Sequence, residues 1–219
     1  MNHDLNRRRM LLALLAGSAG LSGALRLAIA QQPDAQGMRR VAGDVRVNGK
    51  PAERGTPVRP GDSVVTGANG LAVFTVGQDG YLMRAASSAE FSGGGAANLF
   101  RLATGKLLGV FGAGGTRQLE TPTASIGIRG TGAYLESEPG RTYFCLCYGS
   151  ADVRDVRSMM NETYNTSHHE SPRYIYGDGR KSSMVPAGVI NHSDSELIML
   201  EALLGRTPPK AFMDSTSRY

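Results

Sequence analysis

The chain between residues 41 and 156 is divided into short runs by turn signals that recur about every 8 to 12 residues. Asn48-Gly49 is one such signal, and Asp79-Gly80 is interpreted as another. The runs between the turns are rich in β-branched residues, and they show no sustained helical period. The pattern therefore predicts a mainly β domain, built as a short-stranded β-sandwich, prism or solenoid.

The tail of the chain carries a helix signal at residues 194–204. Ser193 and Glu196 have the spacing of a capping box, in which each side chain bonds the backbone N–H of the other. An apolar stripe at helical spacing follows, and Gly205 supplies a stop. The stripe consists of Leu197, Ile198, Leu200, Leu203 and Leu204. We expect one C-terminal helix that packs over one end of the β body.

Residues 1–30 have the pattern of an export signal. A basic cluster with paired Arg7 and Arg8 precedes an apolar run, and Ala28 and Ala30 form a small-residue cleavage site. The arginine pair favours the twin-arginine route, although general secretion and an uncleaved anchor stay open. No later stretch approaches the roughly 18 apolar residues that would span a bilayer. We therefore expect cleavage after about Ala30 and a periplasmic chain without a transmembrane segment.

The charge of the chain is concentrated in this leader. The formal net charge is +5, but without residues 1–30, which hold four arginines and one acid, it falls to +2. Binding to a phosphate backbone requires clustered basic residues. The near-neutral remainder therefore argues against a nucleic-acid partner.

The β body resembles the FecR-type domain, which is named for a periplasmic regulator of ferric-dicitrate uptake. The resemblance covers about residues 41–156, after a linker at 31–40, and leaves residues 157–219 as an extension. Five stretches carry it: GDVRVNGKPA (43–52), VRPGDSVVTGANGLA (58–72), LATGKL (102–107), TPTASIGIRGT (121–131) and YGSADV (148–153).

The resemblance implies an extracytoplasmic β domain that acts by contact rather than by catalysis, often in envelope signalling. Its expected partner is another envelope protein. The regulators that name the family carry a cytoplasmic segment that handles a sigma factor, and this sequence shows no room for one before its export signal. Regulation of iron uptake is therefore not transferred to this chain.

The two cysteines, Cys145 and Cys147, are one residue apart in a predicted strand. Alternate residues of a strand share a face, so both thiols should point one way and Phe144, Leu146 and Tyr148 the other. Their Cα atoms would be about 6.5 to 7 Å apart with near-parallel Cβ vectors, which disfavours a disulfide. Two neighbouring free thiols in an oxidising compartment are explained if a metal ion binds them.

Three histidines follow the cysteines in turn-like contexts: His168, His169 and His192. Two thiolates with one or two imidazoles suit a tetrahedral zinc site, and copper or iron are also compatible. We therefore predict a metal site drawn from Cys145, Cys147, His168, His169 and His192. Alternatively, these residues have structural roles without a metal. The cysteines are then buried apolar residues, the paired histidines form a solvated loop, and His192 helps to cap the helix.

No motif for catalysis accompanies these residues. The sequence contains no GxSxG, HExxH, phosphate-binding loop or CxxC. A metal-assisted hydrolase would need a general base, and Glu170, Asp194 and Glu196 are the nearest carboxylates. We therefore expect a non-enzymatic binding or sensory module. The alternatives are a partner-binding domain without metal, a metal-dependent enzyme and a thiol oxidoreductase.

Overall fold

The structure, a computed structural model, describes residues 36–92, 98–157, 160–180 and 183–216. The expected export signal and most of the linker lie outside these described residues. Within them, no helix combines the length and the apolar character that crossing a membrane would require.

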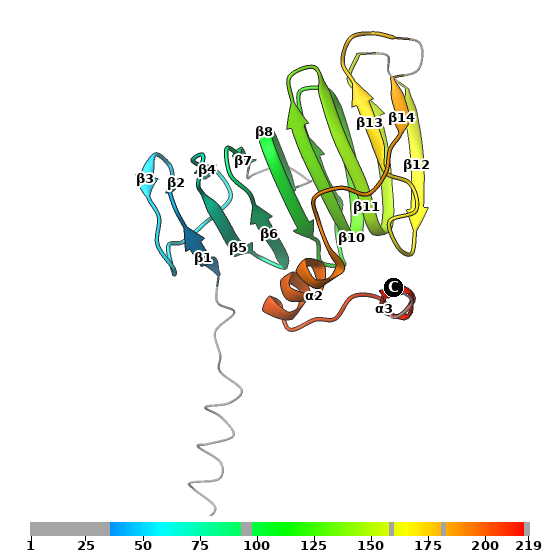
Figure 1. The fold of residues 1–219 in the computed structure, drawn as a ribbon. Coiled ribbons are helices and arrows are strands. Elements are labelled where there is room, and N and C mark those ends of the chain that lie inside the picture. The colour runs from blue at the N-terminus through cyan, green and yellow to red at the C-terminus, as the bar shows by residue number, and fades with distance from the viewer. Residues whose placement is uncertain (1–35, 93–97, 158–159, 181–182, 217–219) are drawn as a thin grey trace, which may run out of the picture. The chain divides into compact units, whose positions relative to one another are not determined.

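Fourteen strands within the described ranges form one hydrogen-bonded sheet that folds over into two layers (Figure 1). Three long strands belong to both layers, since the two halves of each pair with different neighbours: β8 (Asn98–Val110), β10 (Ala124–Glu138) and β11 (Arg141–Asp155). Layer A is completed by β1 (Gly37–Ala42), β5 (Leu71–Val76), β6 (Asp79–Met83), β13 (Arg173–Tyr176) and β14 (Met184–Pro186). Layer B is completed by β2 (Val45–Val47), β3 (Lys50–Pro51), β4 (Ser63–Thr66), β7 (Ser88–Ser92), β9 (Arg117–Glu120) and β12 (Asn161–Thr166). The prediction of a mainly β fold is confirmed.

Glycines with a positive φ lie where the long strands β8 and β11 pass from one layer to the other. Gly105 in β8 has φ 93°, and a Cβ on it would lie 2.2 Å from Ser87 Oγ. Gly149 in β11 has φ 98°, and a Cβ there would lie 2.6 Å from Thr131 Cγ2. Residues with a side chain rarely adopt this φ, so glycine is needed at both bends. Both glycines belong to the stretches that carry the family resemblance.

Apolar side chains gather on both faces of layer A. Between the layers lies the main core, to which Phe74, Leu107, Ile126 and Phe144 contribute. A second apolar cluster lies on the outer face of layer A, where Leu108 and other strand residues meet the tail. Because both faces are covered, β5 and β6 of layer A are buried along most of their length, whereas β1, β13 and β14 are more exposed.

The tail forms two short helices, α2 (Asp194–Leu203) and α3 (Lys210–Thr216). Helix α2 confirms the prediction for residues 194–204, and the N–H of Ser193 donates to Glu196 Oε2 at 3.0 Å, as the capping box requires. Leu197 and Leu200 of α2, with Phe212 of α3, are buried in the second apolar cluster. The sequence analysis did not predict α3, nor that β12–β14 would continue the sheet beyond residue 156.

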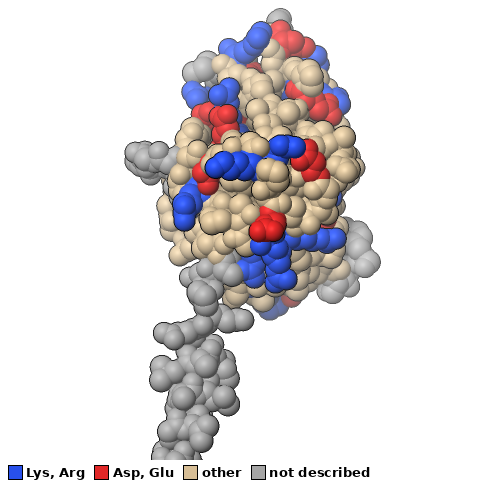
Figure 2. Space-filling view, turned by 90° about the vertical axis from the view of Figure 1, so that its left-hand side faces the viewer, with Lys and Arg blue, Asp and Glu red and all other residues tan. Residues whose placement is uncertain are grey.

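The sheet edge that contains β1 and β3 faces the viewer in Figure 2, which shows basic and acidic side chains interspersed there. The edge of β1 is partly closed by the chain that follows β3. The N–H of Met38 donates to the Thr56 carbonyl at 2.8 Å, and the Gly55 N–H donates to the Met38 carbonyl at 2.8 Å. Charge and closure together protect this edge from pairing with another chain.

Candidate metal centre

Cys145 and Cys147 lie in the layer A half of β11, and both are fully buried on the outer face of that layer. Neither forms a disulfide. Phe144 and Leu146 point into the core between the layers, as the two-residue period predicts. The thiols therefore lie side by side beneath the tail.

The prediction that Tyr148 faces away from the cysteines is wrong. Gly132 of β10 pairs with Tyr148 while Ala133 pairs with Leu146, so Cys147 is an extra residue in a β-bulge. The bulge turns Tyr148 to the cysteine face, where its hydroxyl donates to Glu201 of α2 at 2.5 Å.

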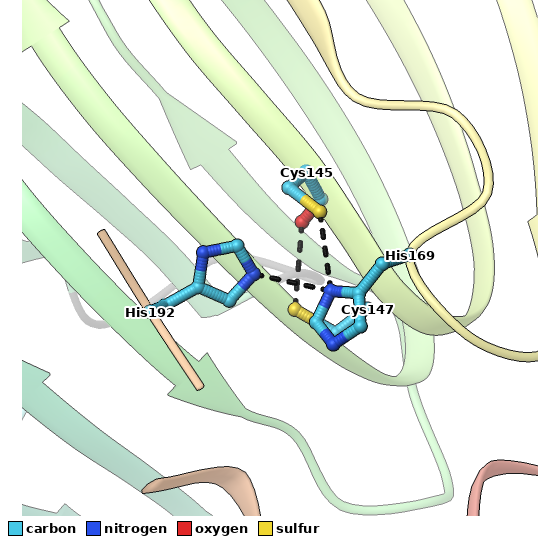
Figure 3. A group of neighbouring side chains, drawn as sticks. All are labelled: Cys145, Cys147, His169 and His192. Atoms are coloured by element: carbon cyan, nitrogen blue, oxygen red, sulfur yellow. Dashed lines mark hydrogen bonds between the residues drawn. The ribbon is translucent and has the colours of Figure 1, made fainter. Parts of the chain in front are cut away.

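The chain brings two histidines to the sulfur atoms (Figure 3). His169 lies in the loop between β12 and β13 with φ 48°, and its N–H donates to the Cys147 carbonyl at 3.0 Å. His169 Nδ1 is 3.4 Å from Cys145 Sγ. His192 lies just before α2, and its Nε2 is 3.1 Å from His169 Nδ1. One ligand atom from each of Cys145, Cys147, His169 and His192 lies within 4.8 Å of all the others.

In His169 and His192, the ring nitrogen that points away from the sulfurs has a partner that can only accept a hydrogen bond. His192 Nδ1 is 2.6 Å from the Ile190 carbonyl oxygen, and His169 Nε2 is 2.9 Å from Asp194 Oδ1. Each of these nitrogens therefore carries the proton of its neutral ring. The inner atoms, His169 Nδ1 and His192 Nε2, then turn their lone pairs toward one another and toward the sulfurs. Two lone pairs that face each other at 3.1 Å repel, and the repulsion is removed when a cation binds between them or when one of the two nitrogens gains a proton.

Two of the separations among the four inner atoms can be compared with those around a tetrahedral ion. Zinc bonds of about 2.3 Å to sulfur and about 2.0 Å to nitrogen place neighbouring ligands about 3.3 to 3.8 Å apart. The observed 3.4 Å between sulfur and nitrogen and 3.1 Å between the two nitrogens lie close to that range. The other separations among the four ligand atoms are at most 4.8 Å, so a cation would draw the most distant pairs together by up to about 1 Å.

His168 lies apart from this group, although the sequence analysis included it among the ligands. Its Nε2 is 2.9 Å from Asp194 Oδ2, so one carboxylate holds both His168 and His169. A carboxylate behind a ligating histidine fixes the ring and makes its free nitrogen more basic. The sequence analysis considered Asp194 only as a possible general base. Its place next to the helix N-cap, close in sequence to His192, was the available signal.

An aromatic ring fixes the other histidine. The ring of His192 stacks on that of Tyr134 in β10, with centroids 4.5 Å apart and planes 19° from parallel. The Tyr134 hydroxyl donates to Glu136 at 2.7 Å, and Asn191 donates to the same carboxylate at 2.7 Å. His192 is therefore held from two sides, by its own backbone neighbours and by the sheet.

The ionisation of the site follows from these contacts. Hydrogen bonding by the Cys147 thiol, and then by His169 and His192, lowers the pKa of Cys145 although burial opposes the shift. Burial, followed by the neighbouring Cys145, raises the pKa of Cys147. Burial would lower the pKa of His169, but Cys145 and Asp194 raise it overall. The group thus favours one thiolate, which is the form that binds a metal.

The fold of this chain is similar to that of a known structure, although its sequence matches no known family. No family model and no curated protein matches the chain. A solved structure of a candidate anti-sigma factor from Parabacteroides distasonis is similar, with a TM-score of 0.50 and 8% sequence identity. The match covers 64% of this chain and 64% of that chain. A second structure of a candidate anti-sigma factor from that organism has a TM-score of 0.49 at 8% identity, covering 57% and 59%. At such identity the likeness shows the fold alone.

Proposed function

We propose that this protein is an exported, non-enzymatic regulatory module of the bacterial envelope that binds one zinc ion through Cys145, Cys147, His169 and His192. The observation that carries the proposal is the gathering of two sulfurs and two imidazole nitrogens within 4.8 Å of one another. The signal-like residues 1–30 support export. The FecR-like stretches, together with the fold, support a regulatory role by contact with another envelope protein.

Zinc is favoured over other metals by the donor set. Two thiolates and two imidazoles in a tetrahedral arrangement are a common structural zinc shell. Copper and iron accept the same donors and are the next candidates. Four protein ligands leave no position for water or substrate, whereas a catalytic zinc keeps one open. The site therefore suits binding or sensing better than hydrolysis.

Elemental analysis of the purified chain tests the proposal. We expect about one zinc per chain after dialysis against a buffer that contains trace metals, and loss of that zinc in Cys145→Ser. His168→Ala is the matched control, because it removes a neighbouring imidazole but none of the four ligands, and it should retain the ion. A wild-type chain without stoichiometric metal, or a Cys145→Ser variant that keeps its metal, would overturn the assignment.

A further inference from the structure

The ligands of the proposed centre come from separate parts of the chain. Two lie on β11 within the sheet, one lies in the loop between β12 and β13, and His192 belongs to the segment that leads into α2. A cation bound by all four would join this segment to the sheet. The attachment of the tail is thereby coupled to occupancy of the centre.

His192 is joined closely to the start of α2. The residue before it, Asn191, has φ 55°, and the residue after it, Ser193, is the helix N-cap. Asp194, the first residue of α2, holds His168 and His169 through its carboxylate. The first turn of the helix is therefore joined to the candidate centre through Asp194, and also to Arg84, whose Nη2 lies 2.8 Å from Glu196 Oε1.

Without a cation, the lone pairs of His169 Nδ1 and His192 Nε2 face each other at 3.1 Å until one ring takes up a proton, and the segment at His192 can separate them most easily. Cys145 is held in β11 by pairing with Tyr134 of β10, and Cys147 lies in the bulge between two paired residues of the same strand. Strand β13 pairs with β11 just before Cys145. The backbone of His169 is bonded to that of Cys147. His192, in contrast, lies in irregular chain between β14 and α2.

The far end of α2 is attached independently of the centre. Glu201 accepts from Tyr148 at 2.5 Å and from Arg206 Nε at 2.6 Å. Leu200 is fully buried beside it.

The first part of the helix has Leu197 and the Arg84–Glu196 ion pair as attachments outside the centre. It also follows His192 directly and carries Asp194 next to the ligands. Loss of the ion should therefore loosen this part and the preceding loop more than the last turn, which is attached independently of the centre.

We infer that metal occupancy controls the docking of residues 187–199 on the outer face of layer A, so that the ion acts as a releasable latch for the tail. The inference rests on the proposed function, since it requires the cation. It deepens that function by naming what occupancy changes. Release uncovers part of the second apolar cluster, including Tyr134, the ring on which His192 stacks.

Hydrogen exchange of the whole chain, with zinc and after chelation, tests the latch. We expect amides in residues 187–199 to exchange at least about tenfold faster without zinc, which corresponds to about 1.4 kcal/mol of opening free energy. Residues 200–204 should change less. Residues 45–66, in the distant part of layer B, should not change.

Two variants separate the latch from a general effect of metal on stability. His192→Ala leaves three ligands, so at saturating zinc it should still bind the ion yet show fast exchange at 187–199. Glu170→Gln, in the same loop as His169 but bonded to Thr166 and Ser167, keeps all four ligands and the contacts of Asp194, and it should show slow exchange. Slow exchange in zinc-loaded His192→Ala, unchanged exchange on chelation, or an equal rise across the chain would each overturn the latch. Absence of zinc binding in the wild type would instead overturn the proposed function, and the latch with it.

Discussion

Replacing Asp194 by asparagine should weaken zinc binding while leaving all four ligands in place. The Asp194 carboxylate is 2.9 Å from each of two rings, His168 and His169, and it accepts the hydrogen bond of His169 Nε2. An asparagine of nearly the same shape offers one accepting oxygen and no charge. It can therefore support one ring at most, and it no longer stabilises charge on His169.

The size of the effect follows from the position of the carboxylate. Removal of such an outer partner typically costs 10- to 100-fold in metal affinity, or about 1.4 to 2.8 kcal/mol. The side chain of Asp194 is 29% exposed, so solvent screens part of its charge. We therefore expect a loss near the lower limit, about tenfold.

The assay is competition between the protein and a chromophoric zinc chelator at one fixed pH. Glu170→Gln is the matched control, because Glu170 lies in the same loop but contacts Thr166 and Ser167. Its affinity should equal that of the wild type. Urea unfolding of the zinc-free variants reports any separate effect on the first turn of α2. Wild-type affinity in Asp194→Asn would refute the role of the carboxylate in holding His169.

Further predictions concern stability and export. Tyr148→Phe removes a buried hydrogen bond to Glu201, so urea unfolding should show a loss of about 1.5 to 3 kcal/mol; an unchanged midpoint would contradict the bulge contact. Gly149→Ala places a Cβ 2.6 Å from a methyl carbon of β10 at a left-handed φ, and should cost at least about 1 to 3 kcal/mol in the same assay. Replacing both Arg7 and Arg8 by lysine should leave the chain in the cytoplasmic fraction if the twin-arginine route is used, and undiminished periplasmic protein would exclude that route.

Local turn chemistry predicted much of the fold. Asn48 and Gly49 both have positive φ, at 52° and 75°, and form the tight turn between β2 and β3. Asp79-Gly80, interpreted as a turn, instead opens β6. The Asp79 carboxylate is buried against Arg117, whose Nε lies 3.1 Å away. A partner so distant in sequence leaves no local pattern, and the aspartate alone suggested a turn.

The candidate centre was predictable to the extent that it depends on strand period. Alternation placed Cys145 and Cys147 on one face, but it could not reveal the bulge that turns Tyr148 to the same side. Which of two adjacent histidines reaches the sulfurs depends on the left-handed backbone at His169. That conformation is set by the contact of its N–H with the Cys147 carbonyl, which exists only after the loop docks.

Strand β11 pairs with β10 along most of its length and passes from one layer into the other. Cys145 faces the tail on one side of the molecule, and Val153, in the same strand, lies in the opposite layer. One strand thus supplies both sulfurs to the tail-covered face of layer A and, beyond Gly149, apolar side chains to the core of the opposite layer.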